Sequence, residues 1–130
     1  MPAKNVISNL FSTIYNNELR RKKECIIAPT SNLAREILRL LQKDGFVGEF
    51  EHIDDGRGGK FRVQLLGRIV KCGPITPRFN VKKSKYDLWE RKYLPSFGYG
   101  MLIVTTPMGV MSQIEARNQG LGGKLLGYIY

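Results

Sequence analysis

The chain has 130 residues, 42% of them hydrophobic and 25% charged, which is enough for one compact domain or two small ones. Its 21 basic side chains against 11 acidic ones give a formal net charge of +10, which favours a polyanionic partner: nucleic acid first, then a membrane or an acidic protein surface. Cys25, Cys72 and the single histidine, His52, are too few for a conventional structural zinc site. No apolar run has the length of a signal peptide or a membrane span, so we expect a cytoplasmic protein, or a nuclear one in transit.

Two helices and a strand are predicted in the first 45 residues. Apolar side chains recur three and four residues apart over 5–19, which predicts an amphipathic helix. Residues 24–29 form a short strand stopped by proline. Ser31 is a typical helix cap and predicts a second helix to about residue 44, ended by Gly45.

The polar end of the first predicted helix has two possible interpretations. It is either a solvated helix end, where cations favour the macrodipole, or a phosphate clamp in which asparagines reach sugar or base edges. The candidate RNA-binding residues here are Asn16, Asn17, Arg20, Arg21 and Lys22.

A hairpin is predicted next, with strands over 46–53 and 60–66. Asp54 and Asp55 stand in the glycine-rich link, where we interpret them as turn formers rather than catalytic carboxylates. His52 is expected to pack or to face solvent. Residues 1–66 thus predict a helix–strand–helix–strand–strand α/β layer.

The composition changes after residue 66. Residues 67–100 carry eight basic and two acidic side chains, interleaved with aromatic rings. Tyr86, Trp89 and Tyr93 are spaced as the buried face of a short helix, which we prefer to stacking on bases. The basic residues expected to contact RNA are Arg68, Lys71, Arg78, Lys82 and Lys83.

The last thirty residues, nearly neutral, predict a strand, a hydroxyl loop, a short helix, a glycine turn and a final strand. Ser112 begins a capping box with Glu115, and Leu125 to Tyr130 is the final strand, with Leu126, Tyr128 and Tyr130 on one face. The stretch is either a structural turn or a rim that presents hydroxyls and backbone N–H groups to phosphate and sugar. The rim residues are Thr105, Thr106, Pro107, Ser112, Gly122, Gly123 and Lys124.

The sequence holds no motif for catalysis, metal or cofactor. Two glycine-rich segments, 56–60 and 120–124, lack the spacing of a phosphate-binding loop, and no nucleophile elbow or paired cysteine motif is present. We therefore expect no enzyme activity, cofactor, metal or small-molecule substrate.

Several ordered motifs together resemble a known family. They are Gly48-Glu49-Phe50, Asp54-Asp55-Gly56, Lys71-Cys72-Gly73, Pro77-Arg78-Phe79, Leu94-Pro95-Ser96, Thr105-Thr106, Gly109-Val110-Met111, Glu115-Ala116, Gly122-Gly123 and Gly127-Tyr128. Over essentially the whole chain the sequence resembles the universal small-subunit ribosomal protein eight family, in its archaeal and eukaryotic form.

The resemblance implies an α/β (α+β) protein of two small subdomains. Residues 1–66 would be an N-terminal α/β subdomain, and 67–130 a C-terminal β-rich subdomain with a basic inserted segment, 77–95. The family binds a helical junction in the central domain of small-subunit rRNA through the hydroxyl loop and helps to assemble the particle. Small-subunit rRNA and neighbouring ribosomal proteins are the implied partners, on cytoplasmic ribosomes, with transient nuclear assembly in a eukaryote.

Two positions depart from the family pattern. Pro107 stands where the family loop commonly has serine, and Asn32 follows Ser31 where a lysine is frequent. Ser31 is retained as an RNA-binding candidate. Two alternatives stay open: a free RNA-binding regulator that acts on an mRNA mimic of the rRNA site, and a nuclease or RNA-modifying enzyme.

Overall fold

The computed structural model describes residues 5–28, 30–54, 56, 58–75, 79–96 and 99–130. Its chain divides into two compact units, Met1–Ile69 (unit 1) and Val70–Tyr130 (unit 2). Helices and antiparallel sheets occur in both, which confirms the predicted α+β class. Whether 1–66 and 67–130 act as separate functional domains stays a prediction.

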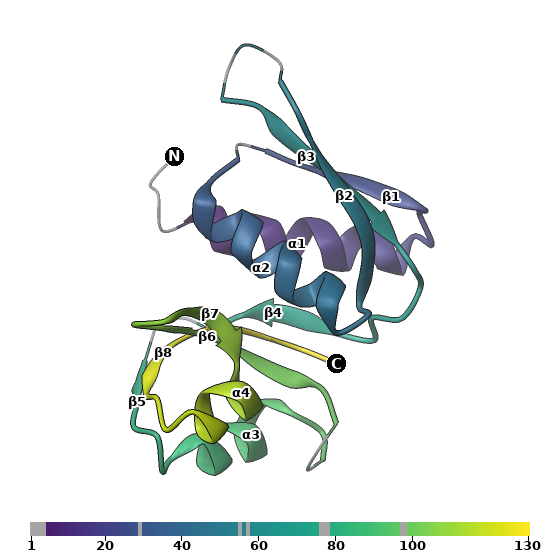
Figure 1. The fold of residues 1–130 in the computed structure, drawn as a ribbon. Coiled ribbons are helices and arrows are strands. Elements are labelled where there is room, and N and C mark those ends of the chain that lie inside the picture. Colours follow the sequence, from purple (N-terminus) through teal and green to yellow (C-terminus); the bar gives the residue numbers. More distant parts are fainter. Residues whose placement is uncertain (1–4, 29, 55, 57, 76–78, 97–98) are drawn as a thin grey trace. The chain divides into compact units, whose positions relative to one another are not determined.

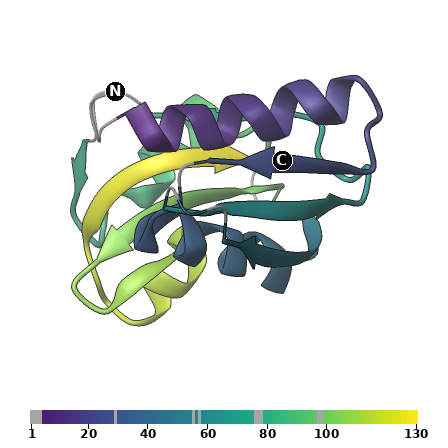
Figure 2. The same cartoon turned by 90° about the horizontal axis from the view of Figure 1, so that it is seen from above.

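Unit 1 has the predicted order of elements: α1 (Asn5–Leu19), β1 (Glu24–Ile27), α2 (Asn32–Lys43), β2 (Val47–Ile53) and β3 (Lys60–Leu65). The three strands form an antiparallel sheet in the order β1-β3-β2 (Figure 1). Alternate residues of β3 are buried, because one face of the sheet packs on the helices while the other is solvated. Figure 2 shows α1 lying along β1.

The two helices of unit 1 end in the same hydrogen-bond pattern with different residues. In α2, Phe46 N donates to Leu41 O and Gly45 takes a left-handed φ of 81°. In α1, Lys22 N donates to Asn17 O, and Arg21 takes the left-handed position with φ 56°. Glycine accepts that conformation freely, whereas a side chain there is strained.

Unit 2 contains β4 (Cys72–Pro74), β5 (Asn80–Val81), α3 (Tyr86–Tyr93), β6 (Met101–Thr106), β7 (Gly109–Ser112), α4 (Gln113–Asn118) and β8 (Gly123–Ile129). Its sheet has the order β4-β8-β6-β7. The short β5 also pairs with β8, at Gly123 and Lys124, whereas β4 pairs with β8 nearer its end. The sequence did not predict β4, β5 or β7. The first two are only three and two residues long, too short for an alternating pattern to show.

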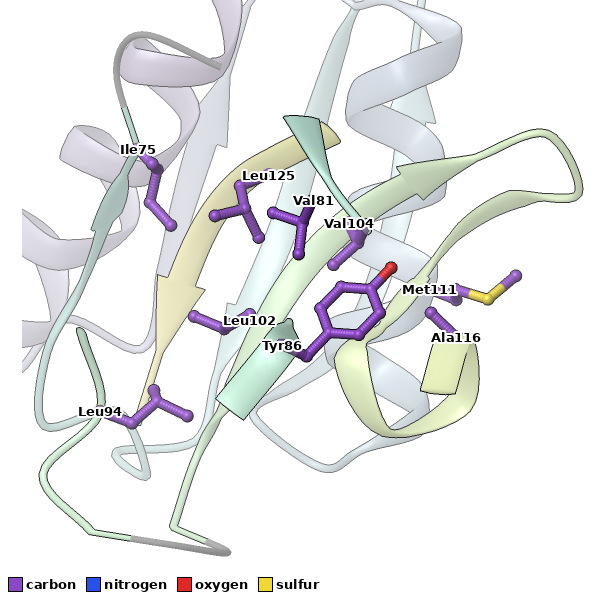
Figure 3. Close-up of a cluster of buried hydrophobic side chains, with 9 residues drawn as sticks. All are labelled: Ile75, Val81, Tyr86, Leu94, Leu102, Val104, Met111, Ala116 and Leu125. Carbon is purple, nitrogen blue, oxygen red and sulfur yellow. The ribbon is translucent and has the colours of Figure 1, made fainter. Parts of the chain in front are cut away.

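The core of unit 2 lies between this sheet and the two short helices. Figure 3 shows Tyr86 of α3 beside Val104 of the sheet and Ala116 of α4 beside Met111. Leu125 belongs to the same buried cluster. Phe79, Trp89, Tyr93, Tyr128 and Tyr130 are partly buried around it. Of the predicted aromatic helix face, Tyr86 is fully buried, while Trp89 and Tyr93 keep part of their surface exposed.

An irregularity in β8 corrects one prediction. The pairing of β6 with β8 runs Ile103 with Gly127 and then Val104 with Leu125, so Leu126 is an extra residue in the ladder. A bulge of this kind reverses the side-chain alternation beyond it. Leu125, not Leu126, therefore shares the core face with Tyr128.

Candidate nucleic-acid interface

The predicted hydroxyl loop is a tight hairpin turn between β6 and β7. Thr106 pairs with Gly109 across it, and Pro107 and Met108 form the turn. The Thr106 hydroxyl donates to Gly109 O at 2.8 Å and accepts from Met108 N at 3.2 Å. Pro107 suits the first turn position, because its φ is preset and its missing N–H is not needed there.

The two threonines of this loop face different surroundings. Thr106 is 9% exposed and its hydroxyl is committed to the turn. Thr105 is half-buried, and across the described part of the chain its hydroxyl makes no hydrogen bond. Thr105 thus has a hydroxyl available for an external ligand, whereas Thr106 stabilises the turn that carries it.

Paired positions place Thr105 in a polar row across the sheet. It pairs with Lys124 of β8, which pairs in turn with Asn80 of β5. Directly paired residues point to the same face of a sheet, and the neighbouring Val104 and Leu125 point to the other, into the core. Lys124 and Asn80 are exposed. Sequence reasoning missed Asn80, because nothing local marks a two-residue strand.

The glycines before Lys124 have a structural reason for lacking a side chain. A Cβ at Gly122 would lie 2.7 Å from the Val81 carbonyl oxygen, and one at Gly123 would overlap the Thr105 carbonyl. In the structure the missing side chains let β8 approach β5 and β6. A contact of these two glycines with an RNA backbone stays a prediction.

These segments meet around one open hollow of about 500 Å³ in unit 2. Its lining includes lysine, asparagine and threonine side chains, which can bind phosphate and ribose, beside apolar surface. The residues predicted to bind RNA that line it are Lys82, Thr105, Thr106, Pro107, Gly122, Gly123 and Lys124; Asn80 and Val81 complete it.

Ser112 does not line this hollow. It is 5% exposed, and its hydroxyl accepts from Glu115 N at 3.3 Å as the N-cap of α4. This bond confirms the prediction that Ser112 begins a helix as its N-cap. A direct RNA contact by Ser112 stays a prediction, but its burial makes it better suited to fix the turn into α4.

The other basic candidates of residues 67–83 are dispersed. Lys71 and Lys83 are exposed. Arg68 is exposed and donates from Nη1 to Gly45 O at 3.2 Å, which ties it to the end of α2. Arg78 lies outside the described residues.

The candidates in unit 1 lie at two helix ends. Arg20, Arg21 and Lys22 are exposed beyond α1 and make no ion pair with any described residue. Asn16 is exposed, whereas Asn17 Nδ2 donates to Thr13 O at 2.7 Å.

Ser31 caps α2, with its oxygen accepting from Ala34 N at 3.1 Å. The cap satisfies one of the amides that a helix leaves open at its start. A cap hydroxyl that accepts can still donate outward, so a contact of Ser31 with RNA stays a prediction.

Two buried groups have raised pKa values. Burial raises the pKa of the Cys25 thiol to about 11, and the nearby carboxylates of Glu18 and Glu24 add to the effect. Burial also raises the pKa of Tyr86, against the opposing influence of Arg117. A protonated, buried thiol is a poor nucleophile, so Cys25 is a core residue.

The carboxylates and the histidine have structural surroundings. Asp54 Oδ1 accepts from Gly56 N at 3.0 Å, which confirms its role in the turn, while Asp55 lies outside the described residues. His52 is exposed and packs edge-on to Phe61 at 5.8 Å. Within the described residues, no three His, Cys, Asp or Glu side chains are grouped to hold a metal, and no helix is long and apolar enough to span a membrane.

Comparison with known proteins agrees with the resemblance. Residues 5–130 match the family described as ribosomal protein S8. The chain is 60% identical over 130 residues to the small ribosomal subunit protein uS8 of Nitrosopumilus maritimus, with both chains fully covered. It is 57% identical over 130 residues to the protein of that name from Cenarchaeum symbiosum and 50% identical over 133 residues to that from Sulfolobus acidocaldarius, again with full coverage of both chains. The chain therefore belongs to the ribosomal protein S8 family, whose members are structural components of the small ribosomal subunit.

Proposed function

We propose that this protein binds a helical junction in the central domain of small-subunit rRNA and helps to assemble and stabilise it. It acts as a structural component of cytoplasmic ribosomes, beside neighbouring small-subunit proteins, and not as an enzyme. Residues 67–130 are the main RNA-binding part in this proposal.

The observation that carries the proposal is the meeting of three distant segments around one hollow. Lys82, the Thr105–Pro107 turn and the Gly122–Lys124 segment contribute to it together. A positively charged, rigid, hydroxyl-bearing concavity suits the wide minor groove of A-form RNA, which exposes ribose hydroxyls and phosphates and is bound by shape.

Each lining group has a distinct role in the proposal. Thr105 and Asn80 bond ribose hydroxyls or base edges, since both lie on the polar row of the sheet. Lys124 and Lys82 neutralise phosphates, and each neutralised phosphate releases a counterion and adds to the salt dependence of binding. Thr106 holds the turn, and Ser112 fixes the start of α4.

The exposed ends of α1 and α2 add contacts in unit 1. Arg20, Arg21 and Lys22 contact phosphates at the end of α1, with Asn16 and Asn17 as hydrogen-bonding groups on the same helix. Ser31 makes a separate hydrogen bond at the start of α2. In the same way Arg68, Lys71, Arg78 and Lys83 add affinity that does not depend on base sequence.

The test is a binding titration of a junction-containing rRNA fragment with two single variants. Thr105→Val keeps shape and removes the available hydroxyl, so it should weaken binding by about 1–3 kcal/mol and leave the free energy of unfolding unchanged. Thr106→Val should instead cost about 1–2 kcal/mol of folding stability, because it removes two hydrogen bonds of the turn. Unchanged affinity in a folded Thr105→Val variant would show that the loop is only structural.

Charge variants make the test more specific. Lys124→Ala should lower the slope of log affinity against log salt by about one. Arg39→Ala removes the same charge from the exposed surface of α2 and serves as the matched control. Equal, weak binding to every RNA offered would contradict the proposal.

Sedimentation of the native protein tests its place in the cell. We expect it to travel with small-subunit particles. Recovery only in light fractions, with tight binding to one RNA retained, would favour the free translational regulator.

A further inference from the structure

A second feature of unit 2 is a group of near-parallel aromatic rings outside the hollow. Phe79 and Trp89 have ring centroids 4.8 Å apart with an interplanar angle of 30°, and Trp89 and Tyr93 are 6.3 Å apart at 11°. Tyr93 continues onto Tyr128 at 5.4 Å and 27°. We refer to Phe79, Trp89 and Tyr93 as the aromatic platform.

The faces of these three rings are covered by a single exposed lysine. Lys92 Nζ lies 5.8, 5.3 and 5.7 Å from the ring centroids of Phe79, Trp89 and Tyr93. Lys92 itself is exposed, so solvent reaches the side chain that lies over the platform. A cation over ring faces is worth only about 0.5–1 kcal/mol when exposed, which a stacking ligand can displace.

The platform rings do more than close the core. They pack against the hydrophobic cluster of unit 2 from its rim, and none of them is fully buried. Tyr86, on the same helix, is 1% exposed and already fills the interior. The exposed surface of three aromatic rings is thus left for an external partner.

The charges around the platform select the kind of partner. Lys92 lies over the rings, and α3 and the turn before it carry three further exposed cations outside the hollow: Lys83, Lys85 and Arg91. Asp87 is exposed, whereas the Glu90 carboxylate is 6% exposed and paired with Arg117. A net positive surround attracts an anion and repels a basic peptide.

We propose that the aromatic platform stacks an unpaired nucleobase of RNA, while Lys92 moves from the ring faces to the adjoining phosphate. Stacking on aromatic side chains beside cations is the general way in which proteins hold unpaired nucleotides. The inference rests on the proposed function in taking RNA as the partner, but its residues differ from those of the hollow.

Trp89 is the single tryptophan of the chain and reports directly on the site. The full-length protein is titrated with a short unstructured RNA and with an abasic ribose-phosphate oligomer of the same length. RNA should quench Trp89 fluorescence and the abasic oligomer should not. Equal responses to the two, or quenching by a proline-rich peptide and not by RNA, would overturn the proposal.

A pair of substitutions separates ring stacking from burial. Trp89→Leu and Trp89→Phe both keep an apolar side chain against the core, and only the second keeps a ring. Binding of a labelled unstructured RNA should be roughly five- to a hundredfold weaker for Trp89→Leu, with Trp89→Phe closer to the wild type. The salt dependence should be equal in both, because no charge changes. Equal affinities of the two variants for the RNA would refute stacking. If Trp89→Leu does not fold, the fluorescence titration of the wild-type protein still tests the proposal, because it needs no variant.

A fully paired junction RNA distinguishes this proposal from the first. Trp89→Leu should bind it as the wild type does, whereas Thr105→Val should bind it more weakly. If Thr105→Val binds the paired junction as tightly as the wild type does, RNA binding by the hollow is contradicted and the proposal for the platform stands. If Trp89→Leu binds unpaired RNA as tightly as the wild type does, only the proposal for the platform is contradicted.

Discussion

The two units of this protein are stabilised in different ways. Among the described residues, the side chains buried in unit 1 are apolar, whereas unit 2 also buries Glu90, Thr106, Ser112 and Gln113. Each of these four makes a hydrogen bond or an ion pair within unit 2, as buried polar groups require. Unit 2 therefore adds directional bonds to a hydrophobic core of its own, and these bonds fix the orientation of the side chains that make them. The proposed hollow lies in unit 2.

Truncation of an apolar residue in unit 1 should have the largest effect. Phe61 is 1% exposed, lies edge-on to Phe50 at 5.7 Å and carries Arg35 over its ring at 5.8 Å. Phe61→Ala should lower the free energy of unfolding by about 3–5 kcal/mol in urea titration. His52→Ala, which removes only an exposed neighbour of that ring, should cost less than about 1 kcal/mol. Similar losses in both would show that the packing of Phe61 is not what stabilises unit 1.

In unit 2 the corresponding weak point is a close backbone approach. Gly123→Ala places a Cβ against the Thr105 carbonyl, which cannot move without breaking the pairing of β6 with β8. The expected loss is about 2–3 kcal/mol, followed by Trp89 fluorescence during unfolding. Gly48→Ala is the control in unit 1, because the atoms it would meet belong to the flexible Gln64 side chain. An equal tolerance of both would contradict the assigned role of Gly123.

A polar substitution tests the directional bonds themselves. Gln113 is 2% exposed, and its Oε1 accepts from Leu102 N at 2.8 Å. Gln113→Met keeps the volume but leaves a buried amide without its acceptor, for a loss of about 1–3 kcal/mol. Gln42→Met on the exposed surface of α2 should change stability by less than about 0.5 kcal/mol.

The same contrast explains what the sequence could predict. Hydrophobic spacing and cap residues predicted every helix and strand of unit 1, because its interior follows helical and strand periods. In unit 2 the sequence did not predict β7. This strand has only four residues, and its two apolar residues, Val110 and Met111, are adjacent, so no alternation of apolar and polar residues marks it. The bulge at Leu126 is set by tertiary pairing and leaves no local signal.

The candidate site was predicted in part for similar reasons. Residue chemistry identified Thr105, Lys124 and Lys82, but not that Thr106 is used within the turn. Only the register of β5 on β8 adds Asn80 to the row. Adjacent hydroxyls look equivalent in a sequence, and the opposite faces of a strand make them different.

The smallest expected effect is at Arg21, at the end of α1, where folding stability favours glycine and RNA binding favours a basic side chain. Arg21 is the only described non-glycine residue with a positive φ, in the position that Gly45 occupies after α2. Arg21→Gly should therefore raise the free energy of unfolding by about 0.5–1 kcal/mol, in spite of the added freedom of the unfolded chain. It should also lower the salt slope of rRNA binding by about one, because a phosphate contact is lost. Arg21→Ala separates the two terms, since it removes the charge and keeps the strain: binding should fall equally, without the gain in stability. If Arg21→Gly gains stability and binds rRNA as tightly as the wild type does, the basic end of α1 is a solvated helix end and unit 2 alone carries the RNA contact.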